Sequence, residues 1–333
     1  MELKMQRNLC GCHHPYARVD LVWASTIGDD DSGSERTLLV DRHISLRAHE
    51  SDVSAAEHEL KVMCYLAGVQ LEQGYTQHRH LVRLHGHFQH QGTLHVLTEY
   101  CHHGTLMMLM EVDSALHQMR QPRLPHFADV NALRSCTTQI CTGVAHLHRH
   151  GVAHLDLAIE NIFIDEEGVF KVGDFRFAKY VSTFNKPSGL SQPLRDAYAA
   201  PETHFGFEID LLKADAWSVG VILFMLWTRQ IPFEETTHDD PKFVALRVAG
   251  LRAFLHQLNS AKHPYVVPED VLLVLEGFLS CDPKDRKTVI ESLELHPWLC
   301  GDHDRIAPAP DSTSASTAAD PAPVSSPIEQ FSV

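Results

Sequence analysis

Three polar residues that can bind a metal ion lie within one short stretch of the chain: Asp156, Asn161 and Asp174. Two apolar segments, 162–164 and 169–172, follow Asn161, and an Asp-Glu-Glu-Gly turn separates them. This pattern predicts a hairpin, whose two ends lie close together and so bring the three side chains into one site. Carboxylate and amide oxygens suit Mg²⁺, which keeps several waters and often takes its other ligands from substrate phosphates.

The same stretch resembles the catalytic and magnesium-binding loops of eukaryotic protein kinases, whose patterns are H-R-D-x-x-x-x-N and D-F-G. By this resemblance, Asp156 orients the hydroxyl group that receives the phosphate. Asn161 and Asp174 would then hold Mg²⁺. Two positions depart from the patterns, because Leu155 stands where the family has Arg and Arg176 stands where it has Gly.

Four further segments resemble kinase signatures and follow the family's order: 200–202 (APE), 215–220 (DAWSVG), 282–286 (DPKDR) and 296–299 (HPWL). The resemblance implies a buried ion pair between Glu202 and Arg286, and an anchoring role for Asp215 beneath the catalytic loop. Taken alone, Asp156 and Asp174 would be interpreted as turn or cap residues. The ordered series of motifs favours the kinase fold, although a fold does not carry its function with it.

The segment before these motifs resembles the smaller lobe of a kinase. Residues 54–66 place apolar side chains on one helical face, as in the kinase regulatory helix. Segments 81–88 and 93–100 alternate like paired strands and lead into a stretch that resembles the kinase hinge, with Thr98 as gatekeeper. The resemblance assigns nucleotide binding to five residues: Glu59, Thr98, Glu99, Cys101 and Phe163.

We therefore expect an α+β fold with the two lobes of a protein kinase. The small lobe, residues 10–99, should be rich in β-strands with one regulatory helix, and the large lobe, residues 100–300, should be mainly α-helical. Residues 1–9 are expected to be an N-terminal tail. Residues 301–333 are rich in Pro, Ser and Ala and are expected to be disordered.

Several residues that kinases use to handle ATP are replaced. The best alignment of the glycine-rich loop, 12–19, has Cys, His and Ala at the three glycine positions and contains a Pro. In the strand 36–42, either Val40 or Asp41 replaces the lysine that binds the phosphates. Ala158 stands where serine/threonine kinases have the Lys that neutralises the transferred phosphoryl group.

The slot for adenine is also altered. Leu38 or Leu39 stands where the family has a small Ala, and Phe163 stands where it has a Leu. These larger side chains are expected to narrow the slot and to complete the apolar column between the lobes without nucleotide. Arg42 or Arg176 can supply some of the lost positive charge, although the planar fork of Arg is a poor substitute for Lys at a point-charge site.

The motifs that stabilise the kinase fold are thus retained, whereas several residues that bind ATP and neutralise the phosphoryl group are replaced. The favoured hypothesis is a pseudokinase or very weak kinase that acts in signalling as a scaffold or allosteric partner. The alternative is a divergent active serine/threonine kinase that transfers the γ-phosphate of ATP to protein hydroxyls. ATP and Mg²⁺ are the expected cofactors, with weak or absent binding that depends on the metal. Other signalling proteins or protein substrates are the expected partners.

Composition excludes some classes of partner. The formal net charge of −15 argues against nucleic acid and anionic membranes. The longest apolar stretch, 219–227, is too short to span a bilayer, and the N-terminus lacks the apolar core of a signal peptide. An intracellular, cytoplasmic protein with reduced thiols is therefore expected.

The chain contains 25 histidines, and two groups of them were considered as metal ligands. The motif at 10–14 combines two Cys and two His, but it lacks a second distant pair at zinc-site spacing, so we interpret it as fortuitous. A second group lies along the predicted strand pair and is interpreted as surface residues: His85, His87, His90 and His95.

Overall fold

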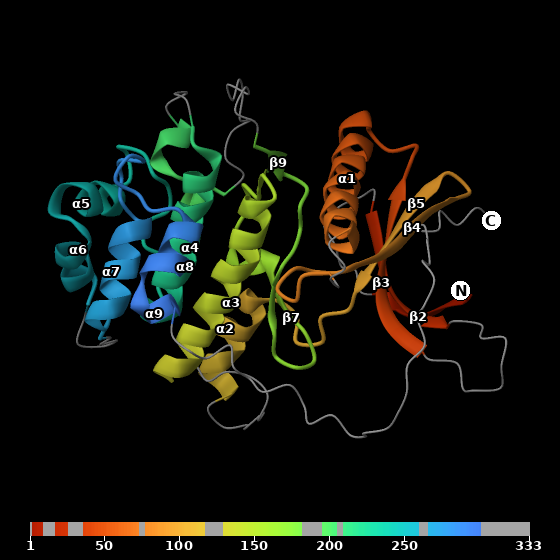
Figure 1. Ribbon diagram of the computed structural model, residues 1–333, viewed down its shortest axis with the longest axis horizontal. Coiled ribbons are helices and arrows are strands. Elements are labelled where there is room, and N and C mark those ends of the chain that lie inside the picture. Colours follow the sequence, from red (N-terminus) through yellow and green to blue (C-terminus); the bar gives the residue numbers. More distant parts are fainter. Residues whose placement is uncertain are drawn as a thin grey trace, which may run out of the picture.

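The computed structural model describes residues 2–8, 17–25, 36–72, 77–116, 129–181, 195–204, 209–259 and 266–300. Within these residues the chain forms a sheet-rich lobe and a helical lobe, as Figure 1 shows. The predicted α+β fold with two lobes is confirmed. The Cys/His motif at 10–14, part of the predicted glycine-rich loop and the predicted tail at 301–333 lie outside the described residues.

The small lobe is built on a five-stranded antiparallel sheet with the order β1-β2-β3-β5-β4. Its strands are β1 (Glu2–Asn8), β2 (Ala17–Ser25), β3 (Arg36–Ser45), β4 (Leu84–His90) and β5 (Thr93–Glu99).

Strand β1 corrects the expectation that residues 1–9 form a tail. It pairs with β2 along the edge of the sheet. Leu3 packs against a small core cluster that contains Val22 and Leu39. The physical basis is a short alternation of apolar and polar residues, in which Leu3 and Met5 are separated by Lys4.

Helix α1 (Glu50–Glu72) contacts β3 and β4 and covers one face of the sheet, as Figure 1 shows. Its buried residues recur at helical spacing, with Glu59, Val62, Met63 and Leu66 all shielded from solvent. The Glu59 carboxylate lies on this buried face and points toward the sheet.

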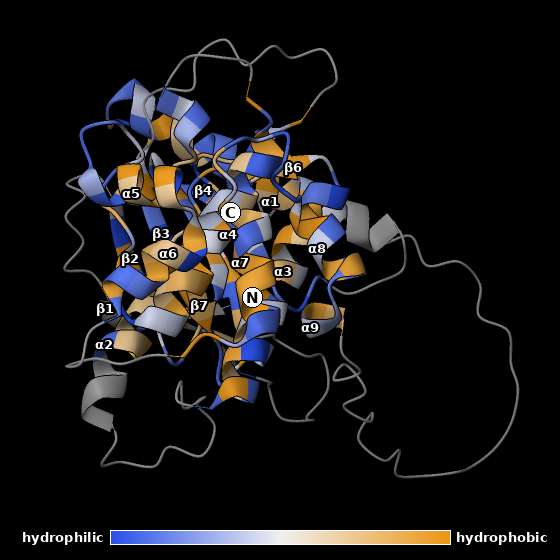
Figure 2. Cartoon of the chain, turned by 90° about the vertical axis from the view of Figure 1, so that its left-hand side faces the viewer, coloured by the Kyte–Doolittle hydropathy of each residue, from blue (hydrophilic) through white to orange (hydrophobic). Residues whose placement is uncertain are grey.

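The large lobe is mainly helical. Its helices are α2 (Leu106–Leu116), α3 (Val130–Arg149), α4 (Leu211–Thr228), α5 (Pro241–Ala249), α6 (Leu251–Leu258), α7 (Glu269–Phe278), α8 (Val289–Leu295) and α9 (Pro297–Cys300). In Figure 2 polar and apolar stretches lie side by side on these helices, as expected of helices with one buried face.

Helix α4 lies at the centre of this lobe. Asp210 begins the helix by accepting hydrogen bonds from the backbone N–H groups of Leu212 and Lys213. Gly220 allows close packing, because a Cβ there would lie 2.8 Å from the Cβ of Phe278 in α7. The helix is apolar and long enough to cross a membrane, but 72% of it is buried inside the protein, as in the core helix of a globular domain.

Two short strand pairs connect the lobes to the catalytic loop. Strand β6 (Val152–Ala153) pairs with β9 (Lys179–Tyr180), and β7 (Ile162–Ile164) pairs with β8 (Phe170–Val172). The second pair confirms the predicted hairpin. Its turn is closed by Asp165, whose carboxylate accepts a hydrogen bond of 2.8 Å from the Val169 N–H.

Candidate active site

Asp215 fixes the loop that carries Asp156. Its carboxylate is fully buried and accepts hydrogen bonds from the backbone N–H groups of His154 and Leu155, at 2.7 and 2.8 Å. His148 contacts the same carboxylate at 2.9 Å. Leu155 adopts a left-handed backbone conformation with φ of 63°, which this dense set of bonds holds in place.

The three predicted metal-capable residues come together at the end of the hairpin. Asn161 ends the short 3₁₀ turn η1 (Ile159–Asn161), and its side-chain amide donates to the carboxylate of Asp156 at 2.9 Å. The Gly173 N–H donates to the Asn161 carbonyl oxygen at 3.0 Å, which places Asp174 directly after this contact. Asp174 also has a left-handed backbone, with φ of 64°.

The guanidinium of Arg176 forms an ion pair with the Asp174 carboxylate. Arg176 donates from Nε to Oδ1 at 2.7 Å and from Nη2 to Oδ2 at 2.6 Å. Burial by itself would raise the pKa of Asp174, but the hydrogen bonds and the charge of Arg176 outweigh it and lower the pKa. Both oxygens that would face a metal ion are therefore engaged by a bidentate guanidinium.

A second arginine engages Asp156. Arg195 donates from Nε to Asp156 Oδ1 at 3.0 Å and from Nη1 to Glu160 Oε1 at 2.6 Å. It precedes the 3₁₀ turn η2 (Asp196–Tyr198). Burial raises the pKa of Asp156, and Arg195 opposes that rise without cancelling it.

A third arginine lies on β3. Arg42 Nη2 contacts Glu59 Oε2 of α1 at 2.5 Å, and the Glu59 carboxylate is buried. This contact joins the sheet to the helix. Side chains alternate along a strand. The contact therefore shows that the face of β3 that carries Arg42 is the one that points toward α1.

An apolar column runs between the two lobes. Met63, Leu84 and Phe175 line one small cavity of about 20 Å³ between α1 and the sheet. The His154 ring lies 5.5 Å from the Phe175 ring, and its Nε2 contacts the Gly173 carbonyl at 3.0 Å. The column therefore runs from the regulatory helix to the loop that Asp215 anchors.

These motifs and their geometry can be compared with known proteins. A family model described as the protein kinase domain matches residues 52–299. The chain belongs to the protein kinase family. Kinases of this family use ATP and Mg²⁺ in general, and the two-lobed fold is theirs.

The kinase domain is similar to three curated serine/threonine or related kinases. It is 33% identical over 162 residues to the serine/threonine-protein kinase chk1 of Schizosaccharomyces pombe, covering 48% of this chain and 31% of that protein. It is 33% identical over 166 residues to the SNF-related serine/threonine-protein kinase of Homo sapiens, covering 49% and 20%. It is 32% identical over 188 residues to CBL-interacting protein kinase 4 of Oryza sativa subsp. japonica, covering 56% and 38%.

Each match thus spans less than half the length of the relative, so the similarity shows the domain and leaves the whole protein's activity open.

The residue at the position of the kinase lysine is Arg42, because Arg42 is the β3 residue that reaches Glu59. The expectation that Val40 or Asp41 stands there is wrong by one or two residues. The expectation that Leu39 narrows the adenine slot is wrong as well. Leu39 packs with Val22 and other residues on the opposite face of the sheet, and Val40 is the residue that pairs with Thr98.

The predicted hinge residues lie at the end of β5. The Glu99 carboxylate accepts a hydrogen bond from the Arg83 N–H at 2.6 Å and forms an ion pair with Lys171 at 3.1 Å. Its negative charge is therefore balanced by a lysine of the same chain. Cys101 is buried, and burial raises the pKa of its thiol to about 12. Thr98 is half-buried one residue before Glu99.

Phe163 lies on β7, beside the catalytic loop. Its ring packs against Gly173, where an added Cβ would come within 3.0 Å of a ring carbon. The role of Phe163 under an adenine ring stays a prediction, as do the nucleotide roles of Glu59, Thr98, Glu99 and Cys101.

The side chains present do not fit a resident magnesium ion. Both oxygens of Asp174 are hydrogen-bonded to Arg176, and the two oxygens of Asp156 are hydrogen-bonded to Arg195 and Asn161. Mg²⁺ requires near-octahedral oxygen ligands and gives up its waters reluctantly. Carboxylates that already carry a fixed guanidinium are poor ligands for it.

The sequence analysis named Arg42 and Arg176 as sources of positive charge but missed the contact of Arg176 with Asp174 and that of Arg195 with Asp156. The signal available was the residue type: an Arg two positions after an Asp can fold back onto its carboxylate, as Arg176 does on Asp174. No such signal existed for Arg195, which is 39 residues from Asp156.

Proposed function

We propose that this chain is a pseudokinase, a kinase-fold signalling protein that acts through its shape as a scaffold or allosteric partner. The observation that carries the proposal is the occupation of both acidic site residues by internal arginines. Arg176 is hydrogen-bonded to the Asp174 carboxylate, and Arg195 is hydrogen-bonded to the Asp156 carboxylate. Phosphoryl transfer relies on metal ions and free acidic groups at these two positions.

The charge balance of the site supports the same conclusion. Glu59, Glu160 and the two site aspartates supply four carboxylates, and Arg42 with the two arginines at positions 176 and 195 supplies three guanidiniums. A nearly neutral, internally paired cluster has little long-range attraction for the metal–nucleotide complex. Kinase catalysis depends on unpaired charges that are arranged in advance around the phosphoryl group.

The same contacts hold the domain in a closed shape without ligand. Arg42 draws α1 against the sheet through Glu59, and the column through Phe175 joins the two lobes. A scaffold or allosteric partner requires a stable binding surface and does not require a catalytically active site. Other signalling proteins inside the cell are therefore the proposed partners, in place of nucleic acid or membranes.

The divergent active kinase remains the second candidate, and one observation favours it. Asp156 and Asn161 are in direct contact at 2.9 Å, and Asp174 lies immediately beyond them, so the three residues keep a common site. Arg42 supplies a positive charge at the lysine position. For this candidate, a nucleotide would have to displace Arg176 from Asp174 before metal could bind.

A phosphotransfer assay on the full chain tests the proposal. The chain should show no transfer of the γ-phosphate of ATP to a generic basic protein or to itself above the level of its Asp156→Asn variant. That variant is the matched control, because transfer by a co-purified kinase would persist in it. Transfer at about 1 s⁻¹ or more, within the range of active kinases, and lost in Asp156→Asn, would overturn the proposal.

A further inference from the structure

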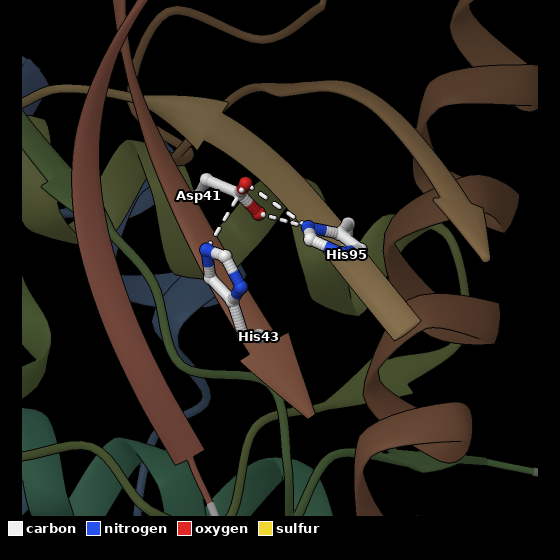
Figure 3. Close-up of side chains that lie close together, drawn as sticks. All are labelled: Asp41, His43 and His95. Carbon is white, nitrogen blue, oxygen red and sulfur yellow. Dashed lines mark hydrogen bonds and ion pairs between the residues drawn. The ribbon is translucent and has the colours of Figure 1, made fainter. Parts of the chain in front are cut away.

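The outer face of the small-lobe sheet carries a cluster of metal-capable side chains, Asp41, His43 and His95. Among the residues that the structure describes, their ligand atoms all lie within 4.8 Å of one another. Figure 3 shows the two imidazole rings turned toward the carboxylate between them. Asp41 and His43 come from β3 and His95 from β5, where His43 and His95 are direct cross-strand partners.

This face lies opposite the face that α1 covers. Arg42, between the two β3 residues, points toward α1, so Asp41 and His43 must point away from it. The cluster is therefore separate from the site that contains Asp156 and Asp174. It also corrects the interpretation of His95 as a surface residue, because only 12% of its side chain is exposed.

We propose that Asp41, His43 and His95 form a binding site for a divalent transition ion, with Zn²⁺ the best match. Two imidazole nitrogens and one carboxylate oxygen are a frequent three-residue ligand set for Zn²⁺, which leaves one position for water. The ion would join β3 to β5 across the sheet. This inference does not depend on the proposed pseudokinase function.

Two of the three distances between the ligand atoms match such a site. His43 Nε2 lies 3.2 Å from Asp41 Oδ2, and His95 Nδ1 lies 3.0 Å from the same oxygen. In tetrahedral zinc coordination with bonds of about 2.0–2.1 Å, neighbouring ligand atoms are about 3.3 Å apart. The two ring nitrogens lie within 4.8 Å of each other, so the rings would adjust around the Asp41 oxygen to surround an ion.

Two neighbours hold the rings in position. The Phe88 ring stacks on His95 with a centroid distance of 4.3 Å and an interplanar angle of 7°. A second buried carboxylate, Asp20 of β2, lies 3.2 Å from His43 Nε2 and is paired with Arg18 at 2.8 Å. Supporting contacts of this kind fix the orientation of first ligands and tune metal affinity.

The alternative is a purely hydrogen-bonded histidine cluster. His95 Nδ1 makes hydrogen bonds to Asp41, but His43 Nε2 is buried and makes none of acceptable geometry, although it lies 3.2 Å from two carboxylates. A buried nitrogen without a hydrogen bond is costly unless another partner satisfies it.

The test is a metal titration of the full chain after treatment with a chelator and removal of the chelator. Zn²⁺ should bind by calorimetry, and Co²⁺ should give the visible absorption of a four-coordinate nitrogen and oxygen site without a thiolate charge-transfer band. Zn²⁺ should also raise the melting temperature, because it binds the folded state. His43→Ala and His95→Ala should each weaken binding by more than about 100-fold.

Two matched controls make the result specific. His90→Ala removes an exposed histidine from neighbouring β4 and should leave binding unchanged. Cys10→Ser with Cys12→Ser removes the separate motif near the N-terminus and should also leave it unchanged. Binding that is lost in the double serine variant but kept in His43→Ala would overturn the proposal, as would the absence of any zinc binding by the wild-type chain. Circular dichroism spectra of all variants establish that they are folded.

Discussion

Arg176 lies two residues after Asp174, and its guanidinium covers the carboxylate with two hydrogen bonds of 2.7 and 2.6 Å. In the family pattern this position is a glycine, which leaves the aspartate open to metal. Here 18% of the Asp174 side chain and 35% of the Arg176 side chain are exposed, so the ion pair is partly shielded from solvent. A single substitution thus replaces a diffusible divalent ion with a tethered monovalent one.

Replacing this arginine should create metal dependence. In Arg176→Gly we expect the chain to lose stability without metal, because Asp174 is left partly buried without a cation. Millimolar Mg²⁺ should then raise the melting temperature of Arg176→Gly, with or without ATP, whereas it should not change that of the wild type. Thermal unfolding at matched ionic strength is the measurement.

The control for this experiment is Asp174→Asn in the Arg176→Gly background. It should abolish the response to Mg²⁺, since the proposed ligand is gone. An equal rise in melting temperature in the wild type would mean that Arg176 does not block the metal.

The two lobes and the hairpin could be predicted because their motifs combine fixed residue types with fixed spacing. The register of β3 could not. Leu38, Leu39 and Val40 are consecutive apolar residues, so alternation does not reveal which of them faces the cleft, and a shift by one residue exchanges the two faces. Only the contact between Arg42 and Glu59, which depends on the packing of α1, decides it.

The sequence predicted which acidic residues lie in the candidate site, but it did not predict which arginines bind them. Asp156 and Asn161 are close in sequence, and the hairpin that follows them requires their proximity to Asp174. Arg195, in contrast, reaches Asp156 across a segment whose path no local pattern determines. Long, flexible arginine side chains can reach several partners, and tertiary structure selects among them.

The pair of Arg195 and Asp156 should be energetically coupled. We expect Arg195→Thr to lower the free energy of unfolding by about 1–3 kcal/mol, since the buried Asp156 carboxylate loses a charged donor. The effect should shrink in an Asp156→Asn background, where no charge remains to be satisfied. Urea unfolding of the two single variants and the double variant measures the coupling, and simple additivity would rule out the contact.

A stacked pair of half-buried histidines should make the fold sensitive to mild acid. His78 and His146 stack with ring centroids 4.2 Å apart. Burial, together with neighbouring histidines, lowers the pKa of His78 to about 3 and that of His146 to about 4. Because the unfolded pKa is about 6.5, their contribution to stability is fully present above pH 6.5 and is lost as the pH falls toward 4.

Urea unfolding between pH 7.5 and 4.5 tests this expectation. His146→Phe keeps an aromatic ring that cannot be protonated, so its stability should fall less steeply with acid than that of the wild type. His90→Gln, at an exposed position, serves as the control and should follow the wild-type slope. Identical slopes for His146→Phe and the wild type would contradict the prediction.

The ion pair between Glu202 and Arg286 should be one of the strongest determinants of stability in the large lobe. Arg286 donates to the two Glu202 oxygens at 2.6 and 2.9 Å, and its side chain is fully buried above the Trp217 ring, 5.0 Å from the centroid. Glu202→Ala leaves a buried cation without its partner, which typically costs about 3–5 kcal/mol. Arg286→Met keeps the volume of the side chain and removes the charge.

A double-mutant cycle on these two substitutions should therefore give a coupling energy of about 2–3 kcal/mol. The exposed pair Arg252–Glu269, with a contact of 2.6 Å, is the control, and its cycle should give a much smaller coupling energy, because solvent screens the two charges. Both pairs have short two-point contacts, but Arg252 is exposed and also binds Glu276, whereas Arg286 is fully buried. Equal coupling in the two cycles would show that the buried pair contributes no more than a surface contact and that residues 200–202 are held by other interactions.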